Sequence, residues 1–501
     1  ALAAARAIQD EEYRAKALSA LADKLPDILP EALAAARAIQ DEEYRAKALS
    51  ALADKLPDIL PEALAAAMAI QHESSRAKAL SALADKLPLE LLPEALAAAR
   101  AIQSESSRAD ALSALADKLP LELLPEALAA ARAIQHESSR AQALSTLANN
   151  LPPELLPEAL AAARAIQSER YCAQVLSALA NKLPPELLPE ALAAARAIQD
   201  QEYRTQALSA LANKLSPELL PEALAAARAI QSEDYRTQAL SALANKLSPE
   251  LLPEALAAAR AIQSERYRIQ ALSALTNKLS PELLPEALAA ARAIQSEDYR
   301  TQALSALANK LSPELLPEAL AAARAIQSED YRTQALSALA NKLSPELLSE
   351  ALAAARAIQS EYYRANALSA LANKLPPELL PEALAAARAI QSEDYCVCAL
   401  SALADKLPPE LLLEALAAAR AIQDENYRAK ALSALANKLS QMPAAKLFSL
   451  WQDTLHELSL RTRPNLLQDI KALFPVIFAL VSEAATVEIA RAIQDVARWW
   501  R

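Results

Sequence analysis

The side chains that could act as nucleophiles or metal ligands are few and widely separated in this chain. The cysteines are Cys172, Cys396 and Cys398, and the histidines are His72, His136 and His456. Because Cys396 and Cys398 are two residues apart, they would point to different faces of a helix, and a metal site needs more ligands in one place. No Ser/His/Asp arrangement stands out. We therefore expect no catalytic residue, no metal site and no cofactor.

Glycine is absent from the whole chain. Loops that cradle phosphates need glycine where the backbone approaches the ligand, and the nucleophile elbow of hydrolases needs it at a strained turn. The composition therefore argues against nucleotide-binding loops and elbow-type hydrolases in this chain. The formal net charge of −11 is spread thinly and includes no basic run, so nucleic acid binding is also disfavoured.

Charged residues that recur at a fixed spacing are the best candidates for a binding surface. If their helices line a concave wall, they form an arginine stripe with glutamates beside it, which suits an acidic or extended peptide. The alternative, which we favour because each arginine comes with a glutamate, is ion pairing between neighbouring repeats. This Arg/Glu ladder consists of Arg228, Arg260, Arg292, Arg324, Arg356 and Arg388, with Glu222, Glu254 and Glu286.

A second recurring pair is Tyr-Arg, as in Tyr267-Arg268 and Tyr299-Arg300. On a helical wheel Arg268 falls inside the apolar sector, where an unpaired charge would be costly. We therefore expect its guanidinium to bind the carbonyls that end the preceding helix, or a neighbouring carboxylate, in a structural role.

These residues are positioned by a unit of about 32 residues that begins with the phrase ALAAARAIQ, as at Ala223, Ala255 and Ala287. A fixed period of this size is typical of a solenoid. Ser248-Pro249-Glu250 has the residues of a helix start, although Pro253 predicts either a short preceding turn or a loose first turn.

The unit predicts two helices, one ending near Ile262 and the next running from the Ser264 cap to about Leu279. Spacing of 3.6 residues per turn places apolar side chains on one face of each helix. In the first helix this face contains Ala255, Leu256, Ala259 and Ile262, and in the second it contains Leu272, Leu275 and Leu279. Arg266, Gln270, Ser273 and Asn277 are expected to face water.

The predicted fold is an all-α solenoid of about 14 two-helix repeats over residues 1–440, coiled into a right-handed superhelix. The first repeat is incomplete, so we expect the protein to continue upstream. Residues 441–501 depart from the phrase and hold all the Trp and Phe of the chain. We interpret this tail as a helical cap over the last apolar face. The alternative is a docking module, and the candidate residues for either role are Trp451, Trp499 and Trp500.

Cysteine usage and hydropathy point to a reducing, aqueous location. Three cysteines argue against a disulfide framework. No apolar run reaches the length of about 18 residues that a membrane span requires. We therefore expect a cytoplasmic protein that does not insert in membranes.

The repeat phrase ALAAARAI-xx-E-x-YRA-x-ALSALA-xx-LPPELLPE and the tail phrases RTRPNLL and RAIQDVARWW resemble the C-terminal helical (TPR- or HEAT-like) repeats of bacterial STAND-type NTPase proteins. The resemblance covers essentially the whole chain. It implies that the repeats sense a ligand or partner and hold an NTPase module shut until it arrives. No such module is present here, and Gln199 stands before the Asp200 cap where related repeats often carry glycine.

The predicted function is a non-catalytic scaffold that recognises a protein or peptide, as the sensing region of a larger STAND-like protein. One alternative is a structural protein whose arrays associate end to end into filaments, and another is an engineered repeat scaffold. The units are too alike to identify the ligand.

Overall fold

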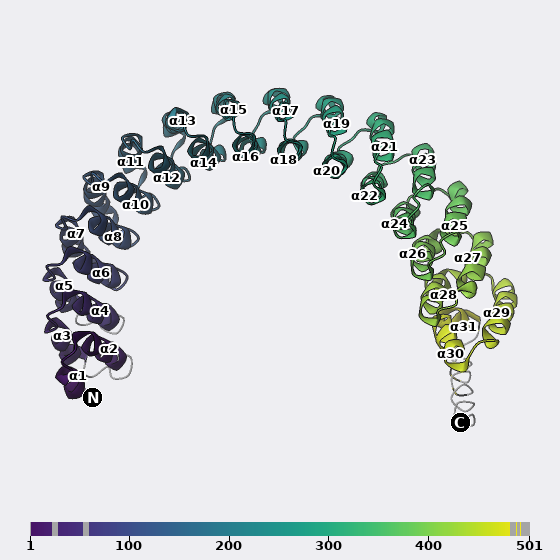
Figure 1. Ribbon diagram of the computed structural model, residues 1–501, viewed down its shortest axis with the longest axis horizontal. Helices are drawn as coiled ribbons and strands as arrows, with labels where there is room; N and C mark the ends of the chain where they lie inside the picture. Colours follow the sequence, from purple (N-terminus) through teal and green to yellow (C-terminus); the bar gives the residue numbers. More distant parts are fainter. Residues whose placement is uncertain (1, 23–28, 54–59, 481–486, 488–490, 492–501) are drawn as a thin grey trace. The chain divides into compact units, whose positions relative to one another are not determined.

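The computed structural model describes residues 2–22, 29–53, 60–480, 487 and 491. These residues form α-helices and short 3₁₀ helices, and no strand occurs among them (Figure 1). The chain runs through successive helix pairs, from α1–α2 to α27–α28, followed by three further helices. The predicted all-α solenoid of two-helix repeats is confirmed, whereas the handedness of the superhelix stays a prediction.

The first helix of each pair is odd-numbered and carries the ALAAAR phrase. These helices are α1 (Leu2–Ala7), α3 (Leu29–Arg37), α5 (Leu60–Met68), α7 (Leu92–Arg100), α9 (Leu124–Arg132), α11 (Leu156–Arg164), α13 (Leu188–Ala197), α15 (Leu220–Arg228), α17 (Leu252–Arg260), α19 (Leu284–Arg292), α21 (Leu316–Arg324), α23 (Pro345–Arg356), α25 (Leu380–Arg388) and α27 (Pro409–Ala421).

The second helix of each pair is even-numbered and carries the Tyr-Arg position. These helices are α2 (Glu11–Ala22), α4 (Glu42–Ala53), α6 (Glu73–Ala84), α8 (Glu105–Leu115), α10 (Glu137–Leu147), α12 (Glu169–Leu179), α14 (Gln201–Ala212), α16 (Glu233–Ala244), α18 (Glu265–Thr276), α20 (Glu297–Ala308), α22 (Glu329–Leu339), α24 (Glu361–Ala372), α26 (Glu393–Leu403) and α28 (Glu425–Leu439).

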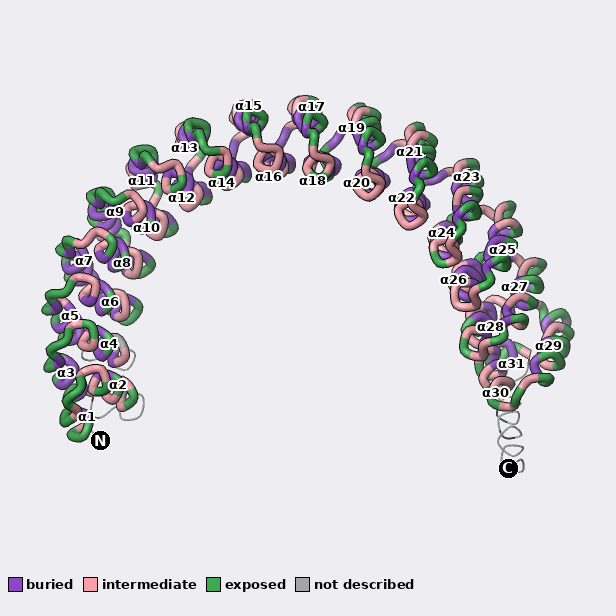
Figure 2. Tube along the Cα trace, viewed as in Figure 1, coloured by how far each residue is buried: buried purple, intermediate pink, exposed green. Residues whose placement is uncertain are grey.

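Burial follows the wheel that the sequence predicts. Leu256 and Ala259 of α17 and Leu275 of α18 are fully buried, whereas Arg266 and Gln270 of α18 are exposed. Figure 2 shows this alternation of buried and exposed faces along the helices. Because alanine has a small side chain, the odd-numbered helices pack closely against their partners, so each pair buries a continuous leucine and alanine core.

A lead-in segment, such as residues 248–254, precedes the ALAAAR phrase of each repeat that has one in full. The second proline of this lead-in determines how the odd-numbered helix begins. Where proline is present, as at Pro221 and Pro253, a 3₁₀ helix precedes the α-helix. Where Ser349 or Leu413 replaces it, a single α-helix starts three residues earlier, at Pro345 or Pro409. Proline has no N–H and its ring clashes with the preceding turn, so the expected short turn exists in every fully described lead-in that keeps this proline. The 3₁₀ helices of this lead-in are η2 (Leu89–Leu91), η3 (Leu121–Leu123), η4 (Pro153–Leu155), η5 (Pro185–Leu187), η6 (Pro217–Leu219), η7 (Pro249–Leu251), η8 (Pro281–Leu283), η9 (Pro313–Leu315) and η10 (Pro377–Leu379).

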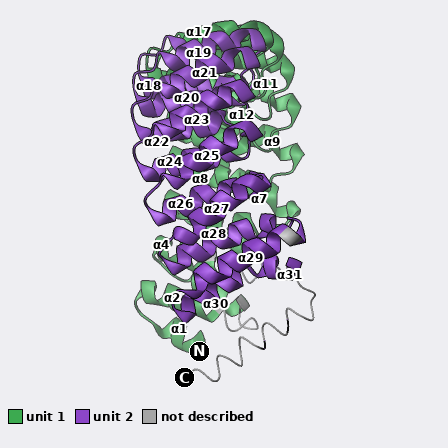
Figure 3. Cartoon of the chain, turned by 90° about the vertical axis from the view of Figure 1, so that its right-hand side faces the viewer, with its two compact units in different colours: residues 1–258 green, residues 259–501 purple. Residues whose placement is uncertain are grey.

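The chain divides into two compact units, residues 1–258 and 259–501, which Figure 3 distinguishes by colour. Within each unit the helices form two layers. Consecutive even-numbered helices contact one another extensively, whereas consecutive odd-numbered helices make few contacts. The closely spaced even-numbered layer therefore lies on the inner side of each unit's curve and the odd-numbered layer on the outer side (Figure 1).

Beyond α28 the described part of the tail consists of α29 (Ala444–Ser459), α30 (Arg463–Ala472) and α31 (Phe474–Leu480). These helices pack against the last repeat. The strongest polar link is a fully buried ion pair, in which Arg428 Nε of α28 donates to Asp469 Oδ2 of α30 at 2.8 Å. The start of the tail at residue 441 and its role as a cap stay predictions.

Candidate functional site

The Arg/Glu ladder lies on the odd-numbered helices and therefore on the outer layer of each unit. The binding alternative supposed a concave wall, whereas these helices form the outer layer of each unit. A helical wheel orients residues within one helix and does not tell which layer lies inside the curve. Each ladder arginine pairs with the glutamate of the next repeat. These pairs are Arg196–Glu222, Arg228–Glu254, Arg260–Glu286, Arg292–Glu318, Arg324–Glu350, Arg356–Glu382 and Arg388–Glu414.

Because the ladder pairs are exposed, they neutralise charge on the outer surface and contribute little to the stability of the fold. Arg324 Nη1 lies 2.7 Å from Glu350 Oε2, and the two side chains are 48% and 53% exposed. Exposed pairs of this kind contribute roughly 0–1 kcal/mol each. The arrangement matches the interpretation of the ladder as ion pairing between repeats. Its use as a binding groove stays a prediction.

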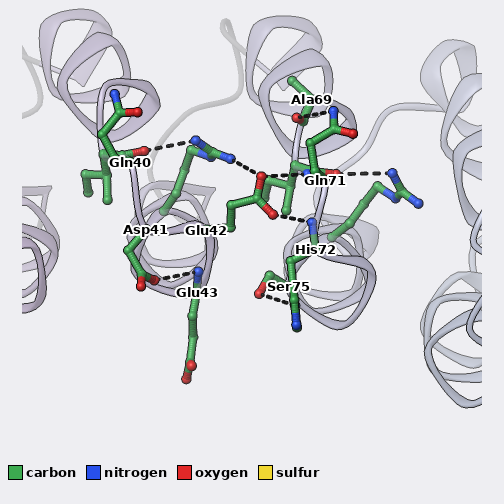
Figure 4. Close-up of polar contacts among 12 residues, drawn as sticks. Gln40, Asp41, Glu42, Glu43, Ala69, Gln71, His72 and Ser75 are labelled. Atoms are coloured by element: carbon green, nitrogen blue, oxygen red, sulfur yellow. Dashed lines mark hydrogen bonds and ion pairs between the residues drawn. The ribbon is translucent and has the colours of Figure 1, made fainter.

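The Tyr-Arg arginines of the even-numbered helices occupy a different environment. In the second repeat Arg45 Nη1 donates to the Ile39 carbonyl oxygen at 2.9 Å, and Arg45 Nη2 donates at 2.9 Å to Glu42, which Figure 4 labels. Arg300 likewise donates to the Ile294 carbonyl oxygen at 3.0 Å. The guanidinium thus binds the carbonyls that end the preceding helix together with a carboxylate, as the sequence predicts.

The glutamate that begins each even-numbered helix links one repeat to the next. Both oxygens of Glu361 accept backbone N–H groups of the following repeat, from Gln391 and Ser392, each at 2.8 Å. Hydrogen bonds from Gln391 and Ser392 to the carboxylate lower the pKa of Glu361 below its usual value. In one repeat Gln201 occupies this position, and its side-chain oxygen still accepts from the Ser232 N–H at 2.5 Å.

Sequence reasoning missed this glutamate and assigned the capping to serine. The Ser264 side chain makes no capping hydrogen bond, although Ser264 does lie at the N-cap position. The aspartates Asp200 and Asp424 do cap their own helices. The sequence does carry a signal for this link, because glutamate occupies the first position of every even-numbered helix except α14. Its partner belongs to another repeat, which a single wheel does not include.

The exposed face of the even-numbered helices carries a row that we call the inner stripe. Along α16 and its C-cap it consists of Asp234, Gln238, Ser241 and Asn245, and the equivalent positions of the other even-numbered helices continue it. These side chains are exposed or half-buried. They share one face by helical spacing, and lie on the inner layer of each unit. The sequence predicted this strip to face water but did not single it out as a site.

Two positions of the inner stripe differ among the repeats. The second helix position is glutamate, serine, arginine, aspartate, tyrosine or asparagine, and the sixth is lysine, aspartate, glutamine, asparagine or cysteine. At the sixth position, for example, Lys78, Asp110, Gln238, Asn366 and Cys398 occupy equivalent places. The inner stripe therefore varies in polar side chains along the array on a repeated backbone.

The remaining candidate residues do not form a reactive cluster in the part of the chain that the structure describes. Cys172 and Cys396 are buried and Cys398 is exposed, and no group of three or more described His, Cys, Asp or Glu side chains could hold a metal ion. His72 and His136 lie at helix N-caps beside serine hydroxyls.

Of the three tryptophans, Trp451 of α29 lies against the array. It lines a small apolar cavity with Leu416 of α27, Leu439 of α28 and Val476 of α31. Trp499 and Trp500 lie outside the described residues. No helix in the described ranges is long and apolar enough to cross a membrane.

Two solved structures share a similar helical-array fold. This chain is similar to the crystal structure of Kap121p bound to Nup53p, with a TM-score of 0.56 and 14% identity over 98% of this chain and 65% of that chain. The structure of Kap121p bound to Ste12p is similar with a TM-score of 0.56 and 13% identity over 99% and 69% of the two chains. The chain therefore spans less than two thirds of the chain in the Nup53p complex. No protein-family model matches the chain, and no curated protein matches it in sequence.

Proposed function

We propose that the chain is a non-catalytic scaffold that recognises a protein or extended peptide along the inner stripe. The observation that carries this proposal is the contrast between an outer ladder that repeats one ion pair and an inner stripe whose second and sixth helix positions vary in side-chain type along the array. A ladder of satisfied ion pairs offers little to a ligand, whereas exposed side chains of varied type can distinguish one ligand from another.

The chemistry of the inner stripe suits a polypeptide ligand. Glutamine and asparagine carry both a donor and an acceptor, so Gln238 and Asn245 can bind the N–H and C=O groups of an extended chain. One set of these groups recurs per repeat on closely spaced helices, so many weak contacts act along one ligand. The similarly folded Kap121p arrays are bound to the proteins Nup53p and Ste12p, which supports this use of the fold.

The resemblance of the repeat and tail phrases to STAND-type proteins supports a more specific role. In this proposal the array senses a ligand in the cytoplasm and belongs to a larger signalling protein whose NTPase module lies outside this chain. The gene tests this part directly. A nucleotide-binding module encoded in the same reading frame is expected, and a complete reading frame without one would contradict it.

The binding proposal is tested by selecting from a randomised library of displayed peptides on the purified chain, with light scattering of the same sample. We expect discrete particles of fixed mass that enrich peptides of common sequence. Failure to enrich any peptide would contradict the proposal. Mass that grows with concentration, with fibres in electron micrographs, would instead favour the filament alternative.

A further inference from the structure

Two repeats lack the Tyr-Arg arginine that all the others carry. The residue is Cys172 in α12 and Cys396 in α26, and these positions are seven repeats apart. The groups that bind the arginine elsewhere are retained in both repeats. They are the carbonyls of Ile166 and Gln167 with the carboxylate of Glu169, and the carbonyls of Ile390 and Gln391 with the carboxylate of Glu393.

The arginine-bearing repeats show what these groups bind. Arg204 donates from Nε to the Ile198 carbonyl oxygen at 2.7 Å and from Nη2 to the Gln199 carbonyl oxygen at 3.2 Å. Arg364 reaches the Ile358 and Gln359 carbonyl oxygens at 2.8 and 3.2 Å. The fold therefore builds a guanidinium-binding set of two carbonyl oxygens and a carboxylate in each repeat.

In the two cysteine repeats this set opens into a cavity of about 350 Å³. The first cavity is lined by Ile166, Gln167, Glu169 and Cys172 on one side and by alanines of α13, among them Ala194, on the other. The second has the same lining, with Ile390, Gln391, Glu393 and Cys396 facing alanines of α27. The alanines give an apolar wall beside a polar end, as an alkyl chain with a guanidinium at its tip requires.

A cavity at the first repeat shows the effect of the arginine. It measures about 390 Å³ and is lined by Arg6, Arg14, Ala34, Ala35 and Ala38. There Arg14 Nε donates to the Ile8 carbonyl oxygen at 2.7 Å. The groove between successive odd-numbered helices is thus present with arginine as well, but the guanidinium covers its polar end. Cysteine leaves that end uncovered.

No other group replaces the missing cation. Among the described residues no donor reaches the Ile166 or Ile390 carbonyl oxygen. Burial raises the pKa of the Cys172 thiol, and the carboxylates of Glu169 and Glu137 raise it further, so the thiol stays neutral. Arg164 lines the first cavity, but its guanidinium is paired with Glu190.

The electrostatics of the site favour a cation. The Glu169 carboxylate accepts the backbone N–H groups of Gln199 and Asp200, each at 2.7 Å, and has lost the arginine that is its neighbour in other repeats. The carbonyls belong to the segment that follows the C-terminus of α11, where the helix dipole attracts positive charge. A planar guanidinium matches this fork of acceptors better than an ammonium does.

We propose that the cavities at Cys172 and Cys396 each bind the guanidinium group of an arginine side chain supplied by a partner polypeptide. The bound group takes the place that the chain's own arginine fills in the other repeats. Both sites lie at the turns between odd- and even-numbered helices, away from the inner stripe, so this proposal does not depend on recognition by that stripe. Free arginine presents the same chemistry, and the test separates it from arginine within a peptide.

The first experiment measures the alkylation rates of the three cysteines by iodoacetamide and mass spectrometry, with N-acetyl-arginine amide as the probe. We expect the probe to slow alkylation of Cys172 and Cys396 several-fold and to leave the exposed Cys398, on the same helix as Cys396, unchanged. N-acetyl-citrulline amide, neutral and nearly isosteric, is expected to protect neither. Protection by both probes, or by neither, would overturn the proposal. Protection by free arginine but not by the blocked amide would assign the sites to the free amino acid instead.

The second experiment counts the sites by calorimetric titration with the same arginine probe. We expect two sites in the wild type, one each in C172R and C396R, and none in the double variant. These variants restore the residue that the other repeats carry, so they should fold. The C172S/C396S variant keeps both cavities and should keep both sites. Binding that survives in the double arginine variant, or no saturable binding by the wild type, would mean that the cavities hold only water.

Discussion

Most repeats contain two arginines with opposite environments. In one repeat Arg292 lies on the outer layer, 47% exposed, and pairs only with the side chain of Glu318. Eight residues later Arg300 lies on the inner layer, 17% exposed, and binds a backbone carbonyl and Glu297. The outer arginine neutralises charge between repeats, whereas the inner one closes the turn between two helices. Position in the layer, rather than residue type, therefore determines what each arginine does.

The comparison predicts that removing an inner-layer arginine costs far more stability than removing an outer-layer one, and most at the last repeat. Arg428 is fully buried and pairs with Asp469, so R428A leaves an uncompensated buried carboxylate. We expect a loss of about 3–5 kcal/mol. Urea denaturation, followed by hydrogen exchange in α28 and α30, measures this change. A loss no larger than that of R292A would contradict the comparison.

The same change within the array should have a smaller effect. R300A removes hydrogen bonds from a charged donor to the Ile294 carbonyl and to Glu297, so we expect a loss of about 1.5–3 kcal/mol. Because repeat arrays gain stability from each unit and its interfaces, the loss should be confined to nearby repeats in hydrogen exchange. R300K keeps the charge without the planar fork and serves as the control. It should recover only part of the loss.

The glutamate that joins repeats should make the array sensitive to acid. The pKa of Glu361 is lowered by hydrogen bonds from the Gln391 and Ser392 N–H groups, so its contribution is present above the ordinary value of 4.5 and is lost as the pH falls through the lower folded-state pKa. The protection factors of those two amides, which are corrected for the pH dependence of intrinsic exchange, should therefore fall below about pH 4.5 in the wild type. E361Q, which copies the natural Gln201, should show no such step. An identical step in E361Q would refute this assignment.

The smallest effect is expected on the outer layer. In a double-mutant cycle of R292A and E318A, the coupling energy should be below about 1 kcal/mol. Both side chains are exposed, so dissolved ions can screen their charges. The coupling energy should therefore also decrease as salt is added. A coupling energy as large as the effect of R300A, or one insensitive to salt, would remove the distinction between the layers.

Much of the fold could be predicted because the repeat provides the same local pattern many times. The helical wheel predicted that Leu256 and Leu275 are buried and that Gln270 is exposed. Pro253 indicated the short turn that the structure shows as a 3₁₀ helix. The bonding of the inner-layer arginines followed from the cost of burying a charge.

What could not be predicted depends on contacts between repeats and on long-range packing. The inner and outer layers are distinguished by the spacing of neighbouring helices, which no single unit encodes. The link from Glu361 to Gln391 spans two repeats, and that from Arg428 to Asp469 joins the array to a tail of different sequence. Gln199, which stands where related repeats often carry glycine, needs no left-handed backbone, because no described residue has a positive φ.

The most direct test of the account is to map peptide binding onto the two layers. Peptides selected on the wild-type chain would be titrated against an inner-stripe variant, Q238A/Q302A/Q334A, and an outer-ladder variant, R228A/R292A/R324A, with folding checked by circular dichroism. The account predicts that affinity falls at least about tenfold, or about 1.4 kcal/mol, in the inner variant and stays within about twofold in the outer one. Loss confined to the outer variant would contradict recognition by the inner stripe.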